Sequence, residues 1–233
     1  MLPRIHRFTS QALLIEALYS RIGALAKRCC AERGRFSVVL AGGTTPQLLY
    51  QQLRNLDTDW TCWHIYFGDE RYLPEDNPER NASMAAAAWL DHVPIPPTQI
   101  HTVHYGDDVH SAARAYAHVL AQAPGIDLAL LGLGEDGHTA SLFPGNETAL
   151  ASTELAIAVT DAPKPPPQRV TMTARSLSSA AAVWFLVTGS AKLQALQNWL
   201  AGAPLPPQSI CPVSGLDLFT DLALPNAITP ERN

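Results

Sequence analysis

The chain has 233 residues, of which 47% are hydrophobic and 16% charged, and its 16 basic and 21 acidic side chains give a net charge of −5. This length suits one α/β domain spanning residues 1–233, and the apolar content supports a packed core rather than a disordered chain. An acidic balance disfavours nucleic acid as a partner, because sequence-independent binding needs clustered lysine and arginine.

Helices and strands are predicted to alternate along the chain. Apolar residues at helical spacing predict a first long helix over Thr9–Arg33, with Thr9 or Ser10 as its cap, and a β-branched run predicts a buried strand over Phe36–Ala41. The later helices are expected over Gln47–Leu56, Pro78–Leu90, Val109–Gln122, Thr173–Ala180 and Ser190–Leu200. The later strands are expected over Trp63–Phe67, Gln99–Val103, Asp127–Leu131, Leu155–Thr160, Arg169–Met172 and Ala182–Val187.

This alternation predicts an α/β fold with a mostly parallel sheet and helices on both faces. The strands are apolar throughout, as expected when both faces of a sheet are buried. The tail after Pro225 is polar and is expected to fray. Ligands in such sheets bind outside the carboxyl ends of the strands, so the polar residues that follow each strand are the site candidates.

A glycine loop follows the first predicted strand. Gly42 and Gly43 let the backbone approach a ligand closely, while Thr45 suits an N-cap and Pro46 the first helical position. Free N–H groups at that helix start favour phosphate. The loop matches neither a Walker motif nor G-x-G-x-x-G, so it does not imply a nucleotide cofactor. A tight turn without a ligand explains the loop equally well.

Asp69, Glu70 and Arg71 follow the next strand directly. The Arg71 guanidinium suits a bidentate grip on a phosphate oxygen pair, with Asp69 or Glu70 orienting it. A surface cluster of ion pairs is the alternative.

His138 lies just past a glycine-rich strand end, two residues after Asp136. Its ordinary pKa of about 6.5 suits proton transfer near neutral pH, and Asp136 is placed to set its tautomer or raise its basicity. Ser141 would complete a Ser–His–Asp triad, but no nucleophile elbow surrounds it.

Three further cations complete the candidate site. Lys164 and Arg169 flank a stiff proline run, and Lys192 lies in the first turn of a helix, where it opposes the helix dipole. A bound anion would explain that placement of Lys192.

The remaining features predict neither a metal site nor export. Cys29, Cys30, Cys62 and Cys211 include no C-x-x-C pair, so reduced thiols in a cytoplasmic protein are expected. His101 and His104 would point to opposite faces of a strand, which argues against a shared metal. The sequence shows neither a signal-peptide pattern nor an apolar run of about 18 residues, so no membrane span is expected.

Taken together, these motifs resemble the 6-phosphogluconolactonase family. The matching stretches are AGGTTP, GDERYLPEDNPERN, DLALLGLGEDGHTASLFPG, PKPPPQRVTMT and VTGSAK, which occur in order over Val38–Lys192. The resemblance implies a Rossmann-like fold and hydrolysis of 6-phospho-D-glucono-1,5-lactone to 6-phospho-D-gluconate in the oxidative pentose phosphate pathway. It implies no cofactor, and we expect a monomer.

The resemblance also implies roles for individual residues. His138 would activate water beside Asp136. The implied substrate-binding residues are Gly42, Gly43, Thr44, Thr45, Asp69, Arg71, Asn81, Arg169 and Lys192. Two positions depart from the family pattern, because Thr44 and Arg80 stand where the family commonly has serine.

Two other functions fit the same residues. One is an amino-sugar-phosphate isomerase or deaminase, a family that shares a G-x-D-G-H block. The stretch after His138 and the Lys164-Pro165-Pro166 run favour the lactonase instead. The other is a sugar-phosphate sensor without catalysis, and the presence of both Asp136 and His138 disfavours it.

Overall fold

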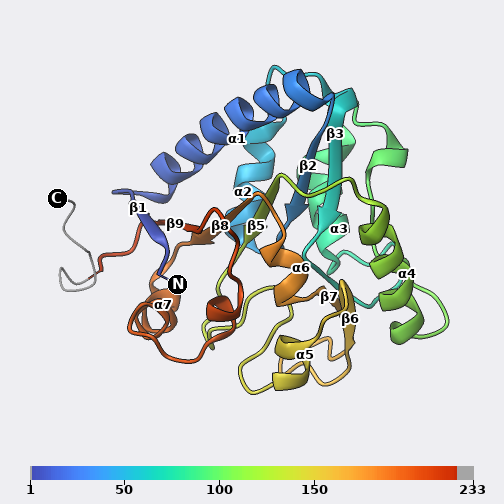
Figure 1. Ribbon diagram of the computed structural model, residues 1–233. Helices are drawn as coiled ribbons and strands as arrows, with labels where there is room; N and C mark the ends of the chain where they lie inside the picture. Colours follow the sequence, from blue (N-terminus) through green and yellow to red (C-terminus); the bar gives the residue numbers. More distant parts are fainter. Residues whose placement is uncertain (1, 225–233) are drawn as a thin grey trace.

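The central sheet has six parallel strands in the order β1-β9-β8-β5-β2-β3 (Figure 1). The computed structural model describes residues 2–224, so the tail after Pro225 lies outside the described residues. The strands are β1 Arg4–Arg7, β2 Phe36–Leu40, β3 Trp63–Phe67, β5 Leu128–Leu131, β8 Ala182–Val187 and β9 Leu216–Thr220. Because all of them are parallel, their carboxyl ends meet along one edge.

Helices cover both faces of this sheet, as the sequence predicts. Val38 and Leu40 pack into one apolar core and Val39 into the other, because successive strand residues point to opposite faces. The core of Val38 and Leu40 includes α1 Gln11–Arg33, α2 Thr44–Leu53 and α3 Asn81–Ala88. The core of Val39 includes α4 Val109–Gln122, α5 Glu147–Ala151, α6 Ala174–Ser178 and α7 Leu193–Leu200.

A second, three-stranded sheet begins where β3 ends. Its order is β4-β7-β6, and both pairings are antiparallel. The strands are β4 Asp69–Arg71, β6 Ala156–Val159 and β7 Arg169–Met172. Only Gly68 separates β3 from β4, so the second sheet starts at the carboxyl edge of the first. The strands β6 and β7 were predicted, but β4 was not.

Local chemistry explains the limits of the long helix α1. The Ser10 hydroxyl accepts a hydrogen bond from the Leu13 N–H, so Ser10 rather than Thr9 is the cap. Gly34 ends the helix at φ 68°, a left-handed conformation that favours glycine, and its N–H donates to the Cys30 carbonyl.

Four predicted elements differ from the observed ones. The strand predicted over Gln99–Val103 is wrong, because a 3-10 turn occupies Pro97–Gln99 and only one bridge, between Ile65 and Ile100, follows it. The helix predicted from Gln47 begins at Thr44 and that predicted from Pro78 begins at Asn81. The segment Ser190–Lys192 is a 3-10 turn that precedes α7.

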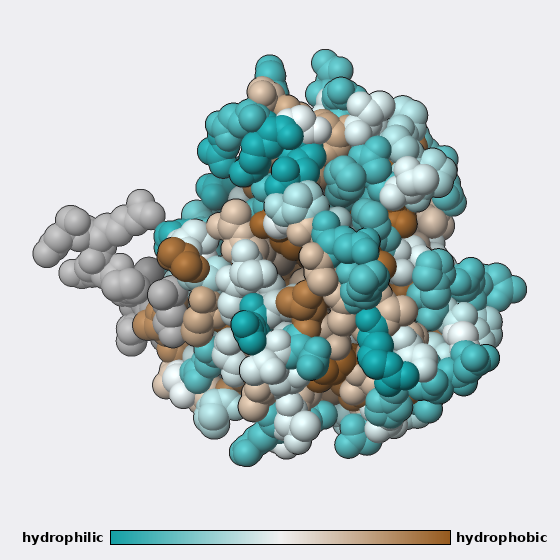
Figure 2. Space-filling model, turned by 45° about the vertical axis from the view of Figure 1, so that its right-hand side comes forward, coloured by the Kyte–Doolittle hydropathy of each residue, from teal (hydrophilic) through white to brown (hydrophobic). Residues whose placement is uncertain are grey.

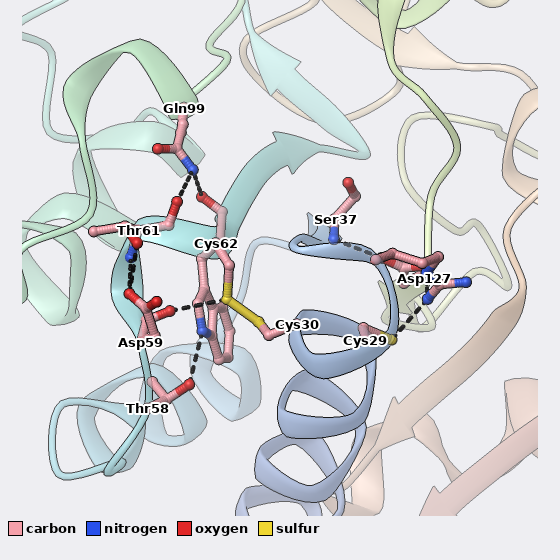
Figure 3. Close-up of a disulfide and its surroundings, with 11 residues drawn as sticks. Cys29, Cys30, Ser37, Thr58, Asp59, Thr61, Cys62, Gln99 and Asp127 are labelled. Carbon is pink, nitrogen blue, oxygen red and sulfur yellow. Dashed lines mark hydrogen bonds and ion pairs between the residues drawn. A yellow bond between two sulfur atoms is a disulfide. The ribbon is translucent and has the colours of Figure 1, made fainter.

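The expectation of reduced thiols is wrong for two of the four cysteines. Cys30, near the end of α1, forms a disulfide with Cys62, in the short 3-10 turn before β3 (Figure 3). Their Cα atoms are 6.0 Å apart, a normal separation for this bond. Sequence spacing does not reveal such a pair, because folding alone brings the end of α1 beside the start of β3. Cys29 and Cys211 are free.

The surface is mixed in character. On the face drawn in Figure 2, polar side chains predominate and apolar ones lie in small separate groups. Within residues 2–224, every helix is too short or too polar to span a bilayer.

Candidate active site

A cavity of about 310 Å³ lies at the carboxyl edge of the central sheet. The loops after β2, β3, β5 and β8 line it together with the second sheet and the proline loop before β7. Its lining contains most of the residues singled out from the sequence, namely Gly42, Gly43, Asp69, Arg71, Asn81, His138, Arg169 and Lys192. Parallel strand direction therefore gathers residues that are far apart in the chain.

The register of β4 and β7 places two cations side by side. Arg71 lies directly opposite Arg169, and Asp69 lies opposite Thr171. Residues directly opposite each other in an antiparallel pair share a face, and like charges there destabilise the sheet. The pKa of Arg169 lies below its ordinary value, because burial disfavours the charged form and Arg71 repels it, against the attraction of Asp69. An anion in the cavity would relieve this repulsion.

Four hydrogen bonds fix the two arginines. The Arg169 Nε donates to the Pro166 carbonyl at 3.1 Å, and its Nη2 donates to the carbonyls of Lys164 and Pro165. Arg169 therefore holds the proline loop in place, and its Nη1 lies 3.9 Å from Asp69 Oδ2. The Arg71 Nη1 donates to the Glu79 carbonyl.

The Asp69 carboxylate is buried and has several partners. It accepts hydrogen bonds from the Ser141 hydroxyl at 2.5 Å and from the Asn81 amide at 3.2 Å, and Arg169 Nη1 lies 3.9 Å away. Ser141 is fully buried and bonds to Asp69, so it does not contact His138 as a nucleophile would. The idea of a Ser–His–Asp triad therefore fails on geometry.

His138 and Asp136 form a dyad in the loop after β5. The two atoms His138 Nδ1 and Asp136 Oδ1 are 2.5 Å apart. Burial lowers the pKa of His138, and Asp136 opposes that shift by its hydrogen bond and charge. The pKa of Asp136 is also lowered, since the hydrogen bond and charge of His138 outweigh its burial. An ionised Asp136 accepts from Nδ1–H, which leaves Nε2 as the basic nitrogen.

Glycine at position 134 is required by this dyad. A Cβ there would overlap His138 Nδ1 and Asp136 Oδ1. The His138 ring also packs on Phe143, with ring centroids 4.8 Å apart. The Asp136 carboxylate and the Phe143 ring together restrict the His138 imidazole to one orientation.

The glycine loop divides its residues between the cavity and the core. Gly42 and Gly43 line the cavity, and Gly43 has φ 110°, a conformation that favours glycine. The Thr45 side chain is buried, where its hydroxyl lies 2.6 Å from that of Thr188, so it does not line the cavity. Thr44 faces an adjoining groove that shares Gly43, Arg71 and Asn81 with the cavity.

Lys192 reaches the cavity from the turn before α7. Burial lowers its pKa, and the charge of Glu135 opposes that shift. In residues 2–224, no cluster of three or more His, Cys, Asp or Glu side chains is suited to hold a metal. His101 and His104 contact different residues, since the His101 ring stacks on Tyr66 and the His104 ring forms a hydrogen bond with Glu75.

Comparison with known proteins shows which family the chain belongs to. A family model described as glucosamine-6-phosphate isomerases/6-phosphogluconolactonase matches residues 9–219. The chain belongs to this family. A 6-phosphogluconolactonase of Mycobacterium tuberculosis is 38% identical over 217 residues, covering 87% of this chain and 88% of that protein. One from Synechocystis is 36% identical and covers 89% of both.

Solved structures of 6-phosphogluconolactonases have the same fold as this chain. A 6-phosphogluconolactonase from Thermotoga maritima has a TM-score of 0.87 at 27% identity, covering 94% of this chain and 99% of that one. One from Trypanosoma cruzi has a TM-score of 0.82 at 26% identity, covering 94% of both chains. The family resemblance and the α/β fold inferred from sequence are confirmed.

Two residues that the family resemblance did not assign also contribute to the site. Lys164 lines the cavity, and its Nζ lies 3.8 Å from Asp136 Oδ1. Ser141 supports Asp69 from the core. The charge of Lys164 beside a proline run was a usable signal, whereas the Ser141 contact joins two loops that are 72 residues apart.

Proposed function

We propose that the chain hydrolyses 6-phospho-D-glucono-1,5-lactone to 6-phospho-D-gluconate in the oxidative pentose phosphate pathway. The observation that supports this most is the His138–Asp136 dyad, which faces two adjacent arginines across one cavity. Hydrolysis of a phosphorylated lactone requires a base to activate water and an anion site to bind the phosphate. The relatives that carry the 6-phosphogluconolactonase name cover most of the chain and support the same reaction.

In this mechanism His138 acts as the general base. Its Nε2 takes a proton from water while the water oxygen forms a bond to the lactone C1 carbonyl carbon. The tetrahedral intermediate then collapses, the bond from C1 to the ring oxygen breaks, and the imidazolium returns its proton to that oxygen. Asp136 holds the tautomer and stabilises the imidazolium. No covalent intermediate is needed.

Other cavity groups position the substrate. Arg71, Arg169 and Lys192 bind the phosphate, and Asp69 and Asn81 orient the ring and its hydroxyl groups. Backbone N–H groups of the glycine-rich turns at Gly42, Gly43 and Thr44 complete the site, and those near C1 would stabilise the oxyanion. Thr45 contributes by fixing the loop from the core.

The variant His138→Ala tests the general base. We expect kcat to fall roughly 10²–10⁴-fold, while binding of 6-phosphogluconate changes little, because the lost group acts on the proton and not on the phosphate. The measurement is lactone disappearance after subtraction of spontaneous hydrolysis. Near-full kcat in this variant would assign water activation to another group.

The same purified protein distinguishes the alternative functions. A deaminase or isomerase would release ammonia or ketose from glucosamine 6-phosphate, and a sensor would bind sugar phosphates without turnover. We expect lactone hydrolysis alone. Turnover of the amino sugar with no lactonase activity would reject the proposal.

A further inference from the structure

Glu70 and Arg80 form a buried ion pair behind the cavity. Their side chains are 1% and 3% exposed, and Arg80 Nε lies 3.5 Å from Glu70 Oε2. Neither residue lines the cavity itself. Strand alternation turns Glu70 away from the face that presents Asp69 and Arg71, and Arg80 borders the adjoining groove that contains Thr44. A buried pair is costly to desolvate and is therefore weak evidence for stability alone.

The Glu70 carboxylate caps helix α3 from a neighbouring strand. It accepts hydrogen bonds from the backbone N–H groups of Arg71, Asn81 and Ala82 at 2.7–2.8 Å. Arg80 is the N-cap residue of α3 and gives no side-chain cap of its own. Glu70 thus ties the start of α3 to β4.

Arg80 ties the same point to two loops. Its Nη1 donates to the Leu73 carbonyl at 3.3 Å, and its Nη2 donates to the Val103 carbonyl. The guanidinium therefore joins three parts of the chain at one place. These are β4 through Glu70, the loop after β4 through Leu73, and the loop after the 3-10 turn Pro97–Gln99 through Val103.

The residues on either side of Arg80 hold two cavity side chains. The Glu79 carbonyl accepts from Arg71 Nη1, and the Asn81 amide donates to the Asp69 carbonyl and carboxylate. Any shift of this segment would move Arg71 and Asp69 together. A Cβ at Gly42 would overlap Asn81 Oδ1, so the glycine loop constrains the segment from the other side.

We propose that Arg80, paired with Glu70, is a positioning residue that sets the place of Arg71 and Asp69 in the cavity. The inference rests on the proposed function, because it assigns Arg71 to the phosphate. Arg80 acts through the backbone carbonyls of Leu73 and Val103 and lies outside the cavity lining.

A double-mutant cycle tests this role. We expect Arg80→Met to raise KM for the phosphorylated lactone about tenfold. In an Arg71→Ala background the same change should alter KM less than about twofold, because Arg71, the side chain through which Arg80 affects phosphate binding, is absent. A structural role without positioning would instead lower thermal stability and give equal effects in both backgrounds.

Two further variants guard against misfolding. Arg80→Lys keeps a charge beside Glu70 but has a single ammonium for several acceptors, so its KM should lie between those of the wild type and Arg80→Met. If Arg80→Met does not fold, the cycle is run with Arg80→Lys. The matched control is Arg33→Met, which breaks the Arg33–Asp127 ion pair at the opposite end of the sheet and should leave KM unchanged.

The outcomes separate the inference from the proposed function. A raised KM in Arg71→Ala with additive effects of Arg80→Met overturns the inference alone. An unchanged KM in Arg71→Ala overturns the phosphate role of Arg71, and the inference with it. Equal KM changes in Arg33→Met and Arg80→Met also overturn the inference.

Discussion

At the scale of single residues, two opposing effects set the basicity of His138. Burial lowers its pKa, and the Asp136 carboxylate raises it, with burial the larger effect. The charge of Lys164, whose Nζ lies 3.8 Å from the same Asp136 oxygen, lowers it further. The net result favours the neutral imidazole, which is the form that accepts a proton.

The pH dependence of kcat/KM should follow from this balance. Because only neutral imidazole is active, kcat/KM should rise with pH through a pKa below about 6.5 and reach its plateau by neutral pH. In Asp136→Asn the negative charge that raises the pKa is lost, so the limb should move to lower pH. The plateau should fall roughly 10²-fold, because the base loses its orienting carboxylate. A limb that moved to higher pH in this variant would contradict the dyad.

Replacement of Arg71 or Arg169 should weaken substrate binding in both cases, but only replacement of Arg169 should also lower thermal stability. Each charged hydrogen bond to phosphate is worth about 1.5–3 kcal/mol, so both alanine variants should raise KM for the phosphorylated lactone and leave unphosphorylated gluconolactone little affected. Only Arg169→Ala should also lower the melting temperature, since Arg169 bonds to three loop carbonyls. Steady-state kinetics on both lactones and thermal melts measure the two effects. Equal losses on both substrates would place these arginines at the carbonyl instead.

Sequence motifs located most of the cavity but not its supports. His138 and Asp136 could be recognised because both lie in one short loop. Thr45 was assigned to the substrate, yet it bonds to Thr188 in the core, a contact between residues 143 positions apart. Contacts of that range depend on how the sheet is assembled, and no local pattern reports them.

At the scale of elements, period and composition found six strands and missed three, namely β1, β4 and β9. The strand β1 has the sequence RIHR, which shows neither an apolar run nor a clear alternation. The strand β4 has three residues and reads as a charged loop, because its strand character comes from pairing with β7. The strand β9, LDLFT, is apolar enough to have been recognised from its own sequence.

The disulfide between α1 and the turn before β3 should stabilise the fold without affecting catalysis. It closes a sequence separation of 32 residues, for which loop entropy gives about 3–4 kcal/mol. The double variant Cys30→Ser, Cys62→Ser should lose about that much unfolding free energy and keep its kcat, since the bond lies at the amino end of β3. Denaturant melts measure the loss.

Cys211→Ser serves as the control because Cys211 is exposed and forms no disulfide. Its melt should match that of the wild type. If the double variant and a reduced wild type were both as stable as the oxidised protein, the bond would contribute nothing in solution.

At the scale of the whole molecule, the proposed chemistry needs only water, one base and an anion site. Activity should therefore survive exhaustive treatment with EDTA and should need no added nucleotide. The measurement is the rate of lactone hydrolysis before and after chelation, with zinc or magnesium added back. Loss on chelation and recovery with a divalent ion would make the water metal-activated and His138 a ligand. The expected monomer, the absence of a nucleic-acid partner and the cytoplasmic location stay predictions.

The pairing of β1 with β9 has a consequence for the order in which the chain is made. The strand Arg4–Arg7 is synthesised before the cavity residues, but its partner strand Leu216–Thr220 emerges only after every cavity residue up to Lys192 has been synthesised. Throughout translation β1 therefore has no neighbour in the sheet. The four strands made between them, β2, β3, β5 and β8, are neighbours in the sheet, but the outer side of β8 stays open until β9 pairs with it. Closure of the central sheet is thus a late event, and a chain truncated before β9 would expose β8 as an unpaired edge open to aggregation.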